Sequence, residues 1–138
     1  MFVDINDHIN VRVYYLKTGH TYKAYTFSEF ENLKLRDSEK TKYQMLNVVM
    51  KQLTWGLQNN LQDEALRDLP DGTTKFYYKT FKEGKLGQTI VSWDAKDKDG
   101  KDVLLSIDTI RGLSPTIAEA IIRGYDEGAL LGDEDEKK

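Results

Sequence analysis

The segment Ser38–Leu61 constrains the fold more than any other, because its apolar residues recur at intervals of three and four. This spacing predicts an α-helix whose core-facing side carries Tyr43, Leu46, Val49, Met50, Leu53, Leu57 and Leu61. Ser38 can cap the start of this helix. Val48 and Trp55 fall on the opposite side, which predicts a partner interface there, with either another layer of the chain or another subunit.

Alternation of apolar and polar residues predicts a half-buried strand at His8–Leu16. Segments that are bounded by turn signals predict four more strands, at Thr21–Phe27, Thr74–Phe81, Leu86–Asp94 and Asp102–Ile107. Glycine-containing turns separate the pairs at 17–20, 82–85 and 98–101. The first four of these segments are therefore expected to form two β-hairpins.

Three shorter helices complete the prediction. Ser28 is expected to cap the first, at 29–35, and a second at 62–68 must end before Pro70. The last spans Thr116–Tyr125, with Ser114 as its cap and Pro115 in its first turn. The chain is therefore predicted to be α+β, with an antiparallel sheet of about five strands packed on one long helix and a C-terminal helix.

The 138 residues predict a single domain over 1–125, followed by an acidic, flexible tail over 126–138. Six carboxylates and two lysines follow Gly124, so this segment has a formal charge of −4, and the rest of the chain +1. No cysteine, secretory signal or membrane-length apolar run is visible. We therefore expect a cytoplasmic protein with no membrane partner.

Asp71, Asp94 and Lys96 resemble the PD-(D/E)xK pattern of metal-dependent nucleases, since Pro70 precedes Asp71 and Lys96 follows Asp94 by two residues. The resemblance implies that the carboxylates hold a divalent ion and that the lysine helps to activate water. A hairpin of Thr74–Phe81 and Leu86–Asp94 would bring Asp71 near Asp94. The alternative interpretation is that Pro70 and Asp71 only form a turn.

The segment Thr109–Ile122 resembles the helix-hairpin-helix motif through Gly112, Leu113 and the following Pro115. The resemblance implies that backbone N–H groups at Gly112–Leu113–Ser114 contact a DNA phosphate. Ser114 replaces the usual second glycine. The alternative is an ordinary helix cap.

Aromatic residues and lysines are interleaved in the two predicted hairpins, as they are in sequence-tolerant binders of single strands, where aromatic faces stack on bases beside lysines that neutralise phosphates. The predicted binding residues are Tyr22, Lys23, Lys75, Tyr77, Lys79, Lys82, Lys85 and Trp93. Packing within the strands would also explain the aromatic residues.

Catalytic and cofactor motifs are not evident in the sequence. The only histidines, His8 and His20, lie at opposite ends of one predicted strand, and Lys96–Asp102 lacks the ligand spacing of an EF-hand. We expect a non-enzymatic accessory protein, of the small kind found in phage or mobile-element replication, that binds nucleic acid. The alternatives are a protein-binding inhibitor or assembly factor, including a homo-oligomer, and thirdly the metal-dependent nuclease.

Overall fold

The computed structural model describes residues 1–4 and 6–136, with side chains to residue 129. Its elements, in order, are β1 (His8–Thr18), β2 (Thr21–Thr26), α1 (Phe27–Asn32), α2 (Asp37–Lys40), β3 (Gln44–Lys51), α3 (Trp55–Ala65), β4 (Leu66–Asp68), β5 (Thr74–Phe76), α4 (Tyr78–Thr89), β6 (Ile90–Trp93), α5 (Ile107–Arg111) and α6 (Pro115–Glu136). The predicted α+β class, the antiparallel sheet and the C-terminal helix are confirmed.

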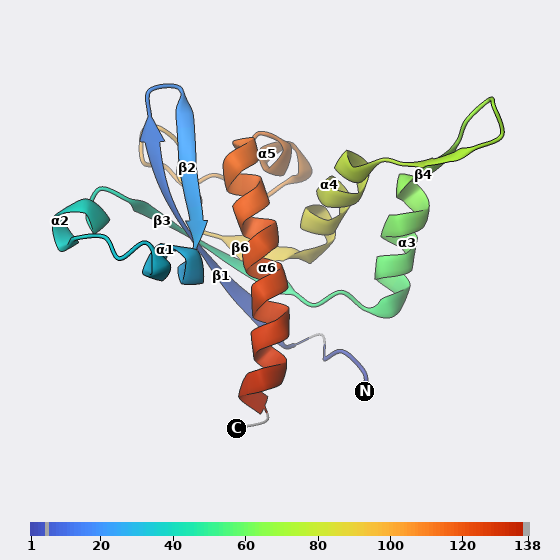
Figure 1. The fold of residues 1–138 in the computed structure, drawn as a ribbon, viewed down its shortest axis with the longest axis horizontal. Coiled ribbons are helices and arrows are strands. Elements are labelled where there is room, and N and C mark those ends of the chain that lie inside the picture. Colours follow the sequence, from blue (N-terminus) through green and yellow to red (C-terminus); the bar gives the residue numbers. More distant parts are fainter. Residues whose placement is uncertain (5, 137–138) are drawn as a thin grey trace.

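The main sheet is antiparallel with the strand order β2-β1-β3-β6, and α6 crosses one of its faces (Figure 1). Alternate residues are buried on this face from Ile9 to Val13 of β1 and from Leu46 to Met50 of β3, as expected where one side of a strand meets a helix. Val13, Val48 and Met50 are essentially inaccessible to solvent there. Ile121 and Tyr125 of α6 complete this core, together with Leu86 of α4 and Ile110 of α5.

Two glycines allow α6 to lie directly on β1. A Cβ atom at Gly124 would lie 2.5 Å from Val11 Cγ1, and one at Gly128 would lie 2.5 Å from Ile9 Cγ2. The helix was predicted to end at Tyr125, but it continues through Glu136. Asp126 and Glu127 of the predicted acidic tail therefore belong to the helix and contact Lys85 and Ser28 of the body.

Aromatic residues cover part of the opposite face of the sheet, next to α1. Phe30 stacks on Tyr14 with ring centroids 4.2 Å apart and meets Tyr43 edge to face. The cap of α1 is Thr26 rather than the predicted Ser28: the Thr26 hydroxyl accepts the Glu29 N–H, and the Glu29 carboxylate accepts the Thr26 N–H.

The predicted long helix over Ser38–Leu61 is wrong, because its middle forms the strand β3. Leu46, Val48 and Met50 alternate in burial and pair with β1, so period two describes them better than the helical period. Helix α3 starts afresh at Trp55, where the Thr54 hydroxyl accepts the Leu57 N–H. A short apolar run with β-branched residues fits both patterns, and pairing with a neighbouring strand favours the strand.

The second predicted hairpin is also wrong. Strand β5 ends at Phe76, and Tyr78–Thr89 forms α4 before the short strand β6. Gly84 was assigned to the predicted turn and Gly87 to the following strand, but both lie inside α4, where they make room for neighbouring helices. A Cβ atom on Gly84 would lie 2.7 Å from Leu61 Cδ2, and one on Gly87 would lie 2.9 Å from Ile107 Cδ1.

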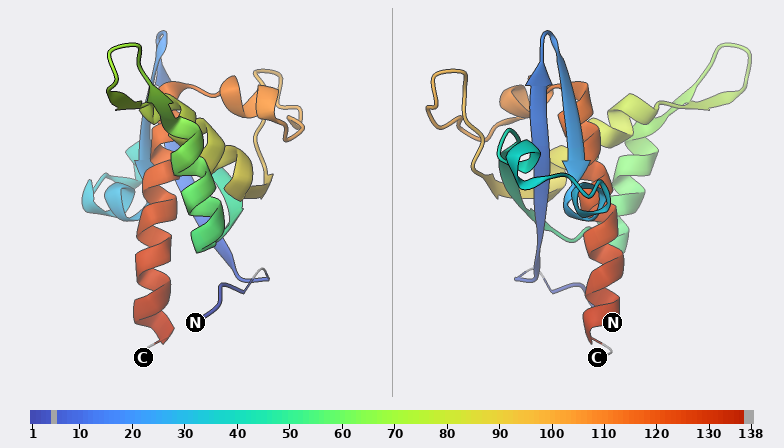
Figure 2. Two further views of the ribbon diagram at one scale, coloured as in Figure 1. Left: turned by 90° about the vertical axis from the view of Figure 1, so that its right-hand side faces the viewer. Right: turned by 60° about the vertical axis from the view of Figure 1, so that its left-hand side comes forward.

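Two further predicted elements change type. The segment predicted as a helix at 62–68 divides between the end of α3 and β4, which pairs with β5 around the predicted turn at 69–73. This hairpin projects from the rest of the molecule (Figures 1 and 2). The predicted strand Asp102–Ile107 is reduced to a single bridge between Lys96 and Asp102, closed by the predicted turn at Gly100, and Ile107 already begins α5.

Candidate functional site

Aromatic and cationic side chains from several segments meet at the end of the sheet next to the β1–β2 turn. Two hollows of about 380 and 400 Å³ adjoin there and share Tyr15, Tyr22 and Lys96. We call this region the aromatic–lysine cleft and define it by Tyr15, Tyr22, Trp93, Lys17, Lys42, Lys96 and Lys98.

The sheet provides the aromatic floor of the cleft. Tyr15 pairs with Ala24, and Lys17 pairs with Tyr22, so strand alternation directs all four side chains to the face that α6 covers further along. The rings of Tyr15 and Tyr22 are tilted with centroids 6.2 Å apart. Both rings are half-buried, which leaves part of each accessible. The indole N–H of Trp93 donates a hydrogen bond to the Val103 carbonyl over 2.8 Å, which fixes the orientation of the ring.

The loop after β6 forms one cationic wall. Asp97 accepts the N–H groups of Asp99 and Lys101, and Gly100 takes a left-handed φ of 77°, which fixes the turn that carries Lys98. Lys96 forms an ion pair with Asp102, and the hydrogen bond and charge of Asp102 raise the Lys96 pKa above its ordinary value. Lys17 lies 5.9 Å from the centroid of the Tyr22 ring.

Electrostatics at the floor keep Tyr15 neutral. Burial raises the pKa of Tyr15 above its ordinary value, and the neighbouring Tyr22 and Asp94 raise it further. The phenol therefore stays protonated near neutral pH and can donate a hydrogen bond. In the larger of the two hollows, the four lining lysines Lys17, Lys42, Lys96 and Lys98 outnumber the single lining acid, Asp97. The cleft is consequently suited to an aromatic or planar ligand that carries negative charge.

The α5–α6 junction forms the opposite wall of the cleft through Gly112, Leu113 and Ser114. The predicted role of Ser114 as helix cap agrees with the Ala118 N–H bonding to its carbonyl. The Gly112 N–H donates to the Asp108 and Thr109 carbonyls, and the Leu113 N–H to the Ile110 carbonyl. These two amides complete α5, so they are not oriented toward a phosphate as the helix-hairpin-helix resemblance implied.

The predicted nucleic-acid residues do not form one surface. Tyr22 and Trp93 lie in the cleft, while Lys23 is exposed on β2 beside it. The other members lie around α4 and the projecting hairpin: Lys75, Tyr77, Lys79, Lys82 and Lys85. Their separation follows from the missing second hairpin.

Two of these lysines are held by carboxylates of α6. Lys82 forms an ion pair with Glu119, and Lys85 with Asp126 over 2.9 Å. Lys79 and Lys82 line a separate hollow between α4 and α6, and Lys75 lies 5.1 Å from the centroid of the Tyr77 ring. This part of the predicted surface is therefore partly neutralised within the chain.

The residues of the nuclease resemblance have separate partners. Asp71 lies in the projecting hairpin, where bonds from Thr73 hold its pKa below the ordinary value. Asp94 accepts the backbone and side-chain N–H groups of Asn47 over 2.7 and 2.8 Å, and Lys96 pairs with Asp102. The hairpin that would bring Asp71 to Asp94 is not formed, and the described residues contain no group of three or more His, Asp or Glu side chains suited to a metal ion.

The two residues of the predicted partner interface, Val48 and Trp55, also lie in different environments. Val48 is 1% exposed in the core, so the chain itself covers it, whereas Trp55 is 83% exposed at the start of α3. The two residues belong to different elements and share no surface stripe.

Sequence reasoning missed Lys42 and Lys98 as members of the cleft. They come from segments far apart in the chain, before β3 and after β6, and the pairing of β3 with β1 and β6 brings those segments together. Tyr15 and Lys17 could have been found, because a two-residue turn at Gly19 places them on one face with Tyr22.

The sequence matches no protein-family model, no curated protein and no solved structure at a significant level, so function has to be inferred from the geometry of the chain. None of the helices in the described residues is long and apolar enough to cross a membrane.

Proposed function

We propose that the chain is a non-enzymatic nucleic-acid-binding protein that holds a single strand in the aromatic–lysine cleft. The observation that carries this proposal is the convergence of Tyr15 and Tyr22 with lysines from three separate segments around two adjoining hollows. Aromatic faces stack on unpaired bases of any sequence, and lysines neutralise the phosphates on either side.

The shape of the cleft favours a single strand over a duplex. Tyr15 and Tyr22 are recessed between the sheet and two walls, so a base can reach them only when it is unstacked and turned outward. The start of α6 borders the same hollow through Ser114, and the positive end of its helix dipole adds to the attraction for phosphate. The biological setting, an accessory role in phage or mobile-element replication, remains a prediction from size and from the lack of catalytic motifs.

The test is a fluorescence-anisotropy titration of a labelled oligothymidylate at several salt concentrations. Tyr22→Ala should weaken binding by about 1–3 kcal/mol, the range for one lost stack. Lys42→Gln and Lys98→Gln should each weaken binding and reduce the slope of log affinity against log salt by about 0.7. Both lysines are exposed, so these replacements should leave the thermal midpoint unchanged.

Matched controls come from the lysines on the other side of the molecule. Lys75→Gln and Lys79→Gln remove the same charge from the projecting hairpin and α4, and should leave the salt slope unchanged. If these controls reduce the slope and the cleft variants do not, the binding surface is the one first predicted from sequence. Binding should also strengthen at low salt when residues 132–138 are deleted, since four carboxylates and two lysines leave with them.

A specific observation favours protein binding as the second candidate function. Trp55 is 83% exposed, and large aromatic residues are enriched at protein interfaces but rare on free surfaces. This alternative, an inhibitor or assembly factor, predicts that no oligonucleotide binds at low salt at micromolar protein concentration. The same titration therefore separates the two functions.

A further inference from the structure

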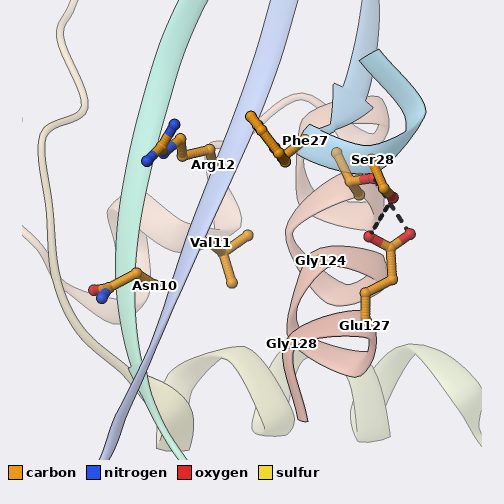
Figure 3. A pocket seen from close by; sticks show the side chains of 9 residues that line it. Asn10, Val11, Arg12, Phe27, Ser28, Gly124, Glu127 and Gly128 are labelled. Atoms are coloured by element: carbon orange, nitrogen blue, oxygen red, sulfur yellow. Dashed lines mark hydrogen bonds between the residues drawn. The ribbon is translucent and has the colours of Figure 1, made fainter. Parts of the chain in front are cut away.

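Strand β1 has a free edge over its first half. Its 11 residues pair with β3 from His8 to Tyr15, but with β2 only from Val13 to Thr18. The register with β2 ends at the pair Val13–Thr26, because Phe27 begins α1. No strand lies beside His8–Arg12 on that side, within the part of the chain that the structure describes (Figure 3).

The hydrogen-bond alternation of the sheet shows which backbone groups this edge presents. The Asp94 N–H donates to the Asn47 carbonyl over 3.2 Å, so Asn47 directs its backbone toward β6 and Val48 directs its own toward β1. Val48 pairs with Val11, which must therefore face β3. The backbone groups of Asn10 and the N–H of Arg12 therefore point away from β3, toward the side where β2 does not pair with this part of β1.

A hollow of about 240 Å³ adjoins this edge, between β1, the start of α1 and α6 (Figure 3). On one side of β1 it is lined by Arg12 and the half-exposed ring of Phe27, which lies 5.3 Å from the guanidinium. On the α6 side it is lined by Gly124, Gly128 and Glu127. The two glycines bring the α6 backbone directly against Val11 and Ile9, so α6 forms a close wall of the hollow beside β1.

The Glu127 carboxylate provides a fixed negative charge at the hollow. It accepts hydrogen bonds from the Ser28 hydroxyl over 2.8 Å and from the Thr26 hydroxyl over 3.3 Å. These are neutral donors, and no cation within 4 Å of Glu127 is found among the described residues. Arg123 attracts Glu127 electrostatically but is itself paired with Glu29, so the Glu127 carboxylate is oriented and forms no ion pair of its own among the described residues.

We propose that the free edge His8–Arg12 binds an extended basic segment of a partner protein, which adds a strand to the sheet beside β1. The inference goes beyond the proposed nucleic-acid function and does not rest on it. Asn10 offers an N–H and a carbonyl to the added strand, and Arg12 offers an N–H. Residues of the partner opposite Ile9 and Val11 face α6, where lysine or arginine can reach Glu127. Residues opposite Asn10 face Phe27, where an apolar side chain fits.

A second copy of this chain is a poorer occupant. Antiparallel pairing of two such edges about Asn10 would place both α6 helices on the same face of the joined sheet. The two Glu127 carboxylates would then lie along one seam without a cation between them, which is unfavourable. A basic segment instead brings the opposite charge.

The probe is a fluorescein-labelled pentapeptide of alternating valine and lysine, with valine at its centre and both ends. It matches the length of His8–Arg12 and places lysine on the α6 side when the central valine lies opposite Asn10. N-methylation of the central valine removes the N–H that pairs with Asn10, and should weaken binding by about tenfold or more. N-methylation of the backbone amide of a lysine, which points away from β1, should change binding by less than about twofold.

Two protein variants test the same contacts. Asn10→Pro removes an edge N–H that bonds nothing in β3, so it should keep the fold and lose the peptide. Glu127→Gln keeps an acceptor for one of the two hydroxyl groups of Ser28 and Thr26, can donate its amide N–H to the other, and removes the charge. It should lose the preference for lysine over a glutamine-containing peptide. Slower amide exchange of Asn10 in wild-type protein with peptide provides a readout that needs no variant. Failure of the parent peptide to bind at low salt, or equal effects of the two N-methylations, would overturn the proposal.

Discussion

Because α6 packs closely on β1, we predict that Gly124→Ala destabilises the protein, whereas helix propensity alone predicts that it stabilises the protein. Replacing glycine by alanine inside a helix usually stabilises it by about 1 kcal/mol. At Gly124 the new Cβ atom would lie 2.5 Å from Val11 Cγ1, about 1 Å inside normal contact. Val11 is 3% exposed and β-branched, so its side chain cannot rotate away at low cost.

The expected result follows from the balance of these two effects. Overpacking of a buried contact costs about 1–3 kcal/mol and the gain in helix propensity offsets about 1 kcal/mol, so Gly124→Ala should destabilise the protein by up to about 2 kcal/mol. The midpoint of thermal unfolding should fall by about 3 °C for each kcal/mol. Urea denaturation followed by the helical circular dichroism signal measures the free energy.

A double-mutant cycle with Val11→Ala isolates the contact. Without Val11 Cγ1, the nearest atoms to the new methyl group are Thr26 Cγ2 and Val11 Cβ, both at the ordinary distance of 3.7 Å. Gly124→Ala should therefore stabilise the Val11→Ala protein by up to about 1 kcal/mol, and the coupling energy should equal the overpacking cost of about 1–3 kcal/mol. Gly56→Ala in α3 is the matched control, since nothing lies within 4 Å of its Cβ position. If Gly124→Ala stabilises the wild type as Gly56→Ala does, α6 does not pack on β1 in this register.

Two further predictions concern the same helix. Tyr125→Phe should lower the free energy of unfolding by about 1 kcal/mol in urea denaturation. The Tyr125 hydroxyl accepts the Leu53 N–H over 2.9 Å, and the variant leaves that N–H unpaired. An unchanged free energy of unfolding would show that water replaces the hydroxyl. Hydrogen bonds from Arg123 hold the pKa of Glu29 below its ordinary value of 4.5. The ion pair therefore stabilises the folded state fully above pH 4.5, and this stabilisation is lost as the pH falls through the lower pKa of the folded state. Denaturation between about pH 5 and pH 3 should therefore show a shallower loss of stability in Glu29→Gln than in wild type, and equal slopes would contradict the role of Glu29.

The sequence predicted elements best where one pattern had no competitor. His8–Leu16 and Thr21–Phe27 alternate strictly around a glycine turn, and both strands form within two residues of the expected bounds. The start of the C-terminal helix was also predicted, because Ser114 and Pro115 suit a helix start and nothing else nearby. These are local signals, and local geometry was enough to interpret them.

The sequence predicted the wrong secondary structure where tertiary contacts select between a helix and a strand or turn that fit the local pattern equally well. Leu46 and Met50 fit both the helical and the strand period, and only their pairing with Val13 and Ile9 of β1 selects the strand. Gly84 and Gly87 are typical of turns, yet they lie in α4 because Leu61 and Ile107 approach too closely for a side chain. The cleft could not be predicted as a unit for the same reason, since Lys42 and Lys98 meet only once β3 has joined β1 to β6.

The two proposed surfaces share one structural dependence, the position of α6 on the sheet. Its start, at Ser114 and Ile117, borders the aromatic–lysine cleft, and its Gly124–Gly128 stretch borders the free edge of β1. Gly124 fixes the helix against Val11 between these two regions. Displacement of α6 would therefore change both sites, whereas Tyr22→Ala and Asn10→Pro act locally on one site each. Independent effects of the local variants and a joint effect of Gly124→Ala are the pattern expected if one rigid helix supports two separate binding surfaces.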